Sequence, residues 1–257
     1  MKFRSATFLF ACSFVASYLS AQDGRMAVEP FFPPLCTTVD AQLKATGKTL
    51  APEDEQKVDT ARIQRAIDRC GKGRAVRLRV NEDKNAFLTG PLVMKQEVAL
   101  ILDRGVTLFA SRDASLYDRR MGSCGRQNEV AAGCKPLISV EKADGAAIMG
   151  DGAIDGRGGE KMLNAQDSWW EFAQKAGKDR VPQLVSVDGS DHFTVYRLTL
   201  RNPPIEAVSF AHGDGLNIWG VHIESSQQIA KPIVAGDGAK NVTISRTTGI
   251  NAESAGH

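Results

Sequence analysis

A short internal repeat constrains this chain more than any other feature of its sequence. Residues 187–191 are similar to residues 210–214, 23 positions further on. Short segments rich in β-branched and aromatic residues, bounded by Gly, Asn, Asp or Pro, surround both copies: 184–187, 193–200, 207–210 and 215–223. A repeat of this length cannot bury an apolar face alone, so successive copies must stack. The repeat therefore predicts an all-β solenoid, a parallel β-helix.

More strand-like segments precede the repeat, at 75–78, 86–89, 98–102, 106–109, 137–140 and 147–150. Ahead of them, apolar residues recur at helical spacing between Asp59 and Gly71, with Arg62, Arg65 and Arg69 on the opposite side. This pattern predicts a helix that begins with Asp59 as its N-cap and ends at Gly71. Because the first coil of a solenoid exposes an apolar end, we expect this N-terminal helix to cap it.

The first 21 residues have the composition of a secretory signal peptide. Lys2 and Arg4 precede the apolar run 6–19, and Ser20 and Ala21 are small residues near a cleavage point. The run is shorter than the ~20 residues that span a bilayer. The alternative is an uncleaved N-terminal anchor. We expect residues 22–257 to form one domain, secreted or periplasmic, without a membrane segment once the signal is removed.

Charge and composition exclude several classes of protein. The formal net charge is +2, and no basic region indicates a nucleic-acid partner. With 42% hydrophobic residues the chain has enough apolar material for a sizeable core.

Residues from the signal to Pro52 are expected to be loop-like, because prolines prevent a regular helix there.

Cysteine usage agrees with export. Cys12 lies in the signal, and the remaining four cysteines are an even number, as expected in an oxidising compartment. Cys124 and Cys134 bracket a glycine-rich loop, so we expect them to form a disulfide, which leaves Cys36 with Cys70 by elimination. Unpaired thiols remain the alternative. No Cys/His spacing resembles a zinc site, and we expect no metal and no cofactor.

Two long excursions interrupt the strand pattern. Residues 111–136 are rich in charge and glycine, and residues 157–180 are partly helical in pattern and contain Trp169 and Trp170. Long loops on a repeat scaffold often wall a binding cleft. The two tryptophans could stack on sugar rings, or pack within the loops.

Several stretches together resemble a known family. Residues 59–68, 87–92, 98–108, 150–156 with Trp169 and Trp170, and 200–204 are similar to the polygalacturonases, family 28 of the glycoside hydrolases. The resemblance implies a right-handed parallel β-helix. It also implies hydrolysis of α-1,4-galacturonosyl bonds in pectin, with inversion. The implied partner is a pectic polysaccharide, polygalacturonate, and we expect the protein to act as a monomer.

The sequence departs from the family where the chemistry should be. An inverting hydrolase needs two carboxyl groups ~6.5–9.5 Å apart. The family is expected to supply them from Asn-Thr-Asp and Gly-Asp-Asp turns, followed by Gly-His-Gly and Arg-x-Lys. Residues 224–238 contain neither acid motif, the interval is about one coil short, and the sequence stops at His257. We therefore expect the domain to be C-terminally incomplete, with an exposed last coil and low solubility.

The remaining catalytic candidates are Asp237 and His257. They are 20 residues apart, close to one coil, so they could be neighbours on adjacent coils. The alternatives are a simple Gly-Asp-Gly turn at Asp237 and a frayed end at His257. Asp214 is expected to be a turn residue, and Asp151 and Asp155 to be scaffold residues.

Three functional hypotheses follow. The first is a secreted polygalacturonase-type hydrolase whose activity is impaired by the missing acids. The second is a non-catalytic β-helix that binds acidic polysaccharide. The third, a pectate lyase, would require several clustered carboxylates around calcium, and the sequence shows no such cluster.

Overall fold

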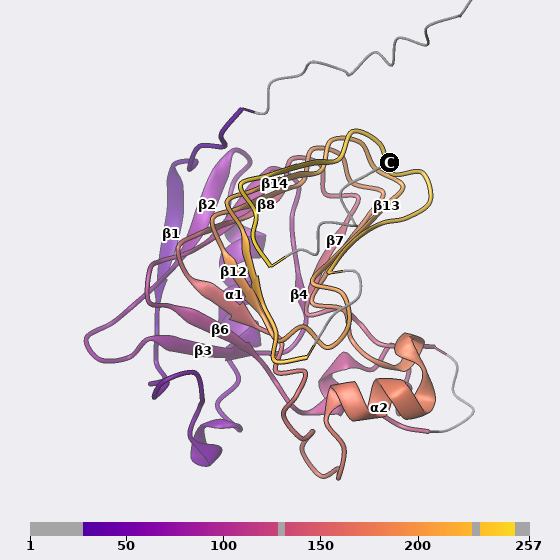
Figure 1. The fold of residues 1–257 in the computed structure, drawn as a ribbon. Helices are drawn as coiled ribbons and strands as arrows, with labels where there is room; N and C mark the ends of the chain where they lie inside the picture. Colours follow the sequence, from indigo (N-terminus) through magenta and orange to yellow (C-terminus); the bar gives the residue numbers. More distant parts are fainter. Residues whose placement is uncertain (1–27, 128–131, 228–231, 250–257) are drawn as a thin grey trace, which may run out of the picture.

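The protein is a parallel β-helix whose coils stack along one axis (Figure 1). The computed structural model describes residues 28–127, 132–227 and 232–249. The predicted signal peptide, residues 1–21, and the candidate His257 lie outside the described residues. No helix in the described ranges is long and apolar enough to cross a membrane.

Three parallel sheets form the sides of the β-helix, and their strands within the described ranges are as follows. Sheet A has β1 (Leu35–Asp40), β2 (Arg74–Arg79), β5 (Val98–Leu102), β8 (Ala147–Gly150), β11 (Thr194–Tyr196), β14 (Asn217–Trp219) and β17 (Thr243–Ser245). Sheet B has β3 (Ala86–Thr89), β6 (Thr107–Ala110), β9 (Ala153–Asp155), β12 (Thr199–Arg201) and β15 (His222–Glu224). Sheet C has β4 (Leu92–Val93), β7 (Ile138–Glu141), β10 (Val185–Asp188), β13 (Val208–Ala211) and β16 (Ile233–Ala235).

The internal repeat corresponds to one coil. Val187 pairs with Phe210 and Asp188 pairs with Ala211, so the two similar segments lie side by side in sheet C. The expectation that successive copies stack is confirmed. Strand spacing stays regular up to β17. Loss of one complete coil relative to the family would leave the remaining coils stacked in this regular way. The structure therefore does not test the shortened interval after β15, which stays a prediction.

Two segments expected as single strands are each divided between two sheets. Residues 193–200 form β11 in sheet A and β12 in sheet B, separated by Arg197 with φ of 62°. Residues 215–223 divide in the same way at Gly220, with φ of 64°. A left-handed backbone conformation turns the chain sharply, and the β-branched residues on both sides hide the break in the sequence pattern.

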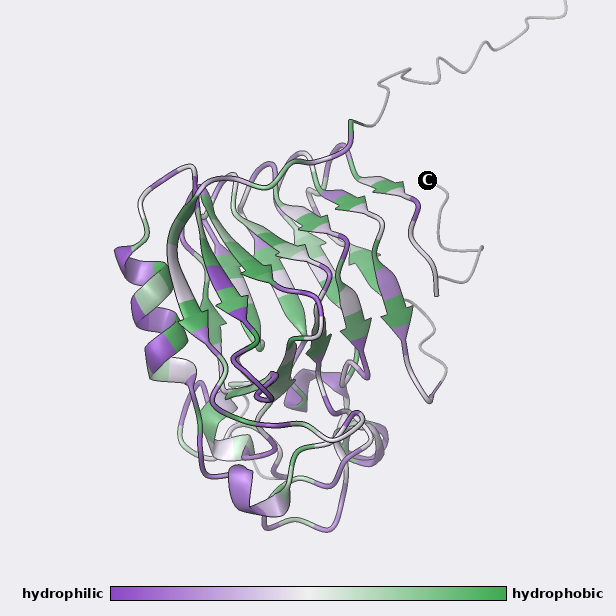
Figure 2. Ribbon diagram, turned by 90° about the vertical axis from the view of Figure 1, so that its left-hand side faces the viewer, coloured by the Kyte–Doolittle hydropathy of each residue, from purple (hydrophilic) through white to green (hydrophobic). Residues whose placement is uncertain are grey.

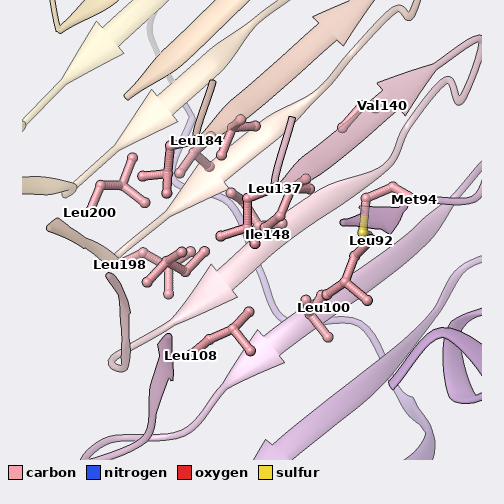
Figure 3. Packing of buried hydrophobic residues seen from close by; sticks show 14 of the residues in the cluster. Leu92, Met94, Leu100, Leu108, Leu137, Val140, Ile148, Leu184, Leu198 and Leu200 are labelled. Atoms are coloured by element: carbon pink, nitrogen blue, oxygen red, sulfur yellow. The ribbon is translucent and has the colours of Figure 1, made fainter. Parts of the chain in front are cut away.

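The core is built from like residues stacked on successive coils. In sheet A, the inward side chains of neighbouring strands form one row: Val76, Leu100, Ile148, Val195, Ile218 and Ile244. Figure 3 shows Leu100 and Ile148 beside Leu92, Leu137 and Leu198 in the same interior. Each buried aliphatic side chain contributes about 1.5–3 kcal/mol, so every added coil lengthens the core by several such terms.

The segment before Pro52 is more ordered than expected. It contains β1, which pairs in parallel with β2. Strand β1 itself has no proline, so each of its N–H groups can donate a hydrogen bond. Residues 28–34 cross the outer face of sheet A, where Phe32 packs on Tyr196 at a centroid distance of 5.2 Å. Glu29 accepts a hydrogen bond from the Tyr196 hydroxyl at 2.7 Å. The outer face of this sheet is therefore largely apolar and covered.

Helix α1 (Thr60–Arg69) lies at one end of the stack (Figure 2). Its Ile63 and Ile67 are buried in the core. Asp59 is the residue before the helix, but its carboxylate binds Arg62 Nε at 2.8 Å instead of a helical N–H, which corrects the predicted capping bond. The sealing of the first coil by this helix stays a prediction.

Both disulfides are present, in the pairs expected from the sequence. Cys36 joins Cys70, with a Cα–Cα distance of 5.6 Å, and ties β1 to the end of α1. Cys124 joins Cys134, at 4.9 Å, within the first excursion. Helix α2 (Trp169–Ala176) forms in the second excursion, with a capping box between Ser168 and Glu171. Among the described residues, three short 3-10 helices lie at Pro52–Asp54, Ala114–Tyr117 and Lys178–Arg180.

Candidate active site

The outer face of sheet C carries a row of small polar side chains. In β10, Val185 and Val187 point into the core and Ser186 points outward, because successive strand residues alternate between faces. The outward positions of neighbouring strands pair in register and form one row: Val93, Ser139, Ser186, Ser209 and Val234. Hydroxyl groups thus recur at the coil spacing of ~4.8 Å on the three coils of Ser139, Ser186 and Ser209.

Carboxylates follow this face at the carboxyl ends of its strands. Asp188 pairs with Ala211 on the next coil, and Asp237 lies one coil further on, where its carbonyl accepts from His212 N–H. Asp188 and Asp237 are exposed and lie two coils apart, a backbone separation of ~9.6 Å. Asp237 therefore lies in a turn at the edge of sheet C, and its predicted neighbour His257 is outside the described residues.

A different histidine lies beside this row. His212 occupies the coil between Asp188 and Asp237, and its Nδ1 is 2.7 Å from Asp188 Oδ1. Both side chains are exposed. Sequence reasoning missed His212 as a partner of Asp188, although the spacing of the repeat places them on adjacent coils.

A second set of aspartates in the same turns has a structural role. Asp191 N–H donates to Asp144 Oδ1 at 2.9 Å, and Asp214 N–H donates to Asp191 Oδ1 at 2.8 Å. Asn241 continues the series and donates to Asp214 Oδ1. These bonds explain why aspartate recurs in the repeat, and they occupy Asp214 and Asn241 as turn residues.

The two excursions project together beyond one corner of the solenoid, between sheets B and C (Figures 1 and 2). They pack on each other: Tyr117 meets Trp169 edge to face, with ring centroids 6.0 Å apart. Trp169 is buried, so it cannot stack on a sugar ring. Trp170 is half-buried, and its Nε1–H donates to Pro203 O at 2.9 Å. The loops form one wall beside sheet C, held by aromatic packing.

A buried ion network anchors this wall to the N-terminal segment. Arg157 contacts Glu55 through both terminal nitrogens and Glu160 at 2.6 Å, and Arg112 reaches Glu55 at 3.0 Å. Burial alone would raise the pKa of Glu55, but hydrogen bonds and the positive charges of Arg157 and Arg112 outweigh burial and lower that pKa. No local sequence pattern indicates this network, because Glu55 and Arg157 are 102 residues apart.

Asp151 and Asp155 lie away from sheet C. Asp155 is buried on sheet B, where burial raises its pKa and the Asn202 amide lies 3.3 Å from its carboxylate. Asp151 pairs with Arg197 at 2.7 Å. Also on sheet B, hydrogen bonds from Arg201 and Lys48 lower the pKa of Glu224 to about 2. These ionic groups link coils and segments.

The described residues contain no group of three or more His, Cys, Asp or Glu side chains arranged to hold a metal ion. Cavities occur elsewhere. Two of them, of about 380 and 320 Å³, flank residues 28–35 on the outer face of sheet A. The outer face of sheet C, between the turn carboxylates and the loop wall, is the candidate surface because it carries the serine row.

Comparison with known proteins gives a consistent assignment. The family model described as "Glycosyl hydrolases family 28" matches residues 70–255. An endo-polygalacturonase of Pectobacterium parmentieri is 36% identical over 209 residues, which are 80% of this chain and 48% of that protein. One of Pectobacterium carotovorum subsp. carotovorum is 34% identical over 236 residues, 88% of this chain and 54% of that protein. The chain thus spans about half the length of these relatives.

A solved structure agrees with the fold. The polygalacturonase from Erwinia carotovora ssp. carotovora superimposes with a TM-score of 0.74 and 33% identity, over 87% of this chain and 57% of that one. The similarity confirms the right-handed parallel β-helix expected from the sequence. With the family model covering most of the chain, the protein belongs to family 28 of the glycosyl hydrolases.

Proposed function

We propose that this protein is a pectin-degrading hydrolase that cleaves α-1,4-galacturonosyl bonds of polygalacturonate with inversion, in the periplasm or outside the cell. The observation that carries the proposal is the family match over residues 70–255 on a β-helix with an open, loop-walled face. A polysaccharide chain can lie along the hydroxyl row of sheet C, which repeats with the coils.

We also propose that catalysis is impaired in this chain. The outward residue of β16 is Val234, and the described strands of sheet C carry no outward carboxylate at the row that includes Ser186 and Ser209. Each missing acid or base removes ~10²–10⁴-fold of rate. Asp188 and Asp237 are the carboxylates at this edge whose two-coil separation comes close to the inverting range.

The test is reducing-sugar release from polygalacturonate by residues 22–257, measured beside the Pectobacterium relatives. Asp237→Asn is the test variant. Asp83→Asn is the matched control, because Asp83 is an exposed carboxylate paired with Lys44 in a different part of the fold. We expect slow release that Asp237→Asn abolishes and Asp83→Asn leaves unchanged.

Each other result decides against part of the proposal. Release as fast as that of the relatives refutes the impairment. Equal release by the chain and by Asp237→Asn removes Asp237 from the reaction. No release from a protein shown by circular dichroism to be folded refutes hydrolysis by this chain.

A further inference from the structure

A cavity of about 270 Å³ lies between helix α1 and strand β1, at the end of the solenoid where α1 is seen in Figure 2. Three arginines line it together with the Cys36–Cys70 disulfide: Arg62, Arg65 and Arg69. Their spacing of three and four residues places them on one face of the helix. The cavity belongs to sheet A and α1, so it is separate from the face of sheet C.

The cavity has an excess of positive charge. Arg62 is neutralised by Asp59, whose Oδ1 accepts from its Nε at 2.8 Å. Arg65 and Arg69 form no ion pair with any residue that the structure describes. Two uncompensated guanidinium groups therefore border this cavity of about 270 Å³.

Arg62 is held rigidly, with a donor left over. Its Nη1 donates to Asp40 O at 2.7 Å, and its guanidinium lies 5.5 Å from the centroid of the Phe87 ring. Its Nη2 is buried and has no hydrogen-bond partner among the described residues. A buried donor without a partner costs about 1–3 kcal/mol, and more when it is charged. Oδ2 of Asp59 is likewise buried without a partner among the described residues, so the uncompensated positive charge at the cavity comes from Arg65 and Arg69.

We propose that this cavity binds a uronate carboxylate of the acidic polysaccharide, as a second saccharide site separate from the loop-walled face. Guanidinium groups bind carboxylates through paired, charge-assisted hydrogen bonds, and several arginines on one face strengthen the effect. The volume accommodates one acidic sugar residue rather than an extended chain. The identity of the anion rests on the proposed function, whereas its charge follows from the arginines.

The test is NMR titration of the ¹⁵N-labelled protein, residues 22–257, with trigalacturonate. We expect the Arg62 Nε–H signal and the α1 backbone amides to shift, and uncharged galactotriose to leave them unchanged. The test variant is Arg65→Gln with Arg69→Gln, both exposed and outside the core. It should weaken the α1 response about tenfold or more. The matched control, Lys84→Gln with Arg104→Gln, removes the same charge at exposed positions elsewhere and should leave the response intact.

Three outcomes would overturn the site. The first is that the α1 signals do not shift with trigalacturonate, and the second is that the control variant loses as much of the α1 response as the test variant. The third is that inorganic sulfate shifts the α1 signals at the same concentration as trigalacturonate, which would indicate a site for small anions in general. The amides of sheet C report on the proposed function independently. If they shift while α1 does not, only this second site fails. If α1 shifts while sheet C is silent and no sugar is released, only the proposed function fails.

Discussion

Replacing Arg157 by Met would remove the centre of the buried ion network. Arg157 and Glu55 are 2% and 4% exposed, and removal of one partner of a buried pair costs about 3–5 kcal/mol. Glu55 keeps Arg112 at 3.0 Å, and Glu160 is partly exposed, so we expect the lower end, about 3 kcal/mol. For a domain of this size that loss lowers Tm by about 6–12 °C.

The measurement is urea unfolding followed by circular dichroism, with Tm as a second readout. Arg104→Met is the matched control, because Arg104 is 82% exposed and 3.6 Å from Asp151, and we expect a loss below about 1 kcal/mol. The double variant Glu55→Met with Arg157→Met should regain part of the stability, because the buried Glu55 charge is removed and Arg112 keeps Glu160 at 3.7 Å. A loss below about 1 kcal/mol for Arg157→Met alone would refute the assigned role of the network.

Three further predictions concern stability. The ion pairs of Glu224 stabilise the fold above the ordinary pKa of 4.5, and their contribution is lost as pH falls towards the folded pKa of about 2; Glu224→Gln should flatten this part of an acid-unfolding curve. Asp191→Ala should cost about 1 kcal/mol in urea unfolding, because the Asp214 N–H loses its acceptor, and Asp191→Asn should be nearly neutral; equal losses would contradict that bond. Gly150→Ala should cost at least about 4 kcal/mol or prevent folding, since a Cβ would collide with the Leu102 backbone carbonyl; a native Tm would disprove this packing.

Much of the fold could be predicted because it depends on local sequence. The strands of the repeat, the helix at Ile63 and Ile67 and the long excursions all have signals within a few residues, and the structure contains them. The division of residues 193–200 could not be predicted, because Arg197 adopts a left-handed conformation that its residue type does not favour. Contacts with both neighbouring coils stabilise that turn, because Arg197 N–H donates to Trp219 O and its guanidinium pairs with Asp151.

For the candidate site, the sequence indicated a turn residue at the edge of sheet C but not which side chains lie next to each other there. It singled out Asp237 and predicted two loops that could wall a cleft. It did not pair His212 with Asp188. The burial of Trp169 was equally hidden, because a tryptophan in a polar loop has the same sequence signal whether it packs inward or faces a ligand.

The sequence by itself determined the class of fold, since a repeat of 23 residues with β-branched segments has to stack to bury its apolar side chains. The tertiary structure alone decided which charges meet. Glu55 and Arg157, or Lys48 and Glu224, are joined across 102 and 176 residues. The repeat period determines where each strand lies in the stack. It does not determine which distant segment packs on the outer face of a sheet, because that depends on the shape of the whole surface.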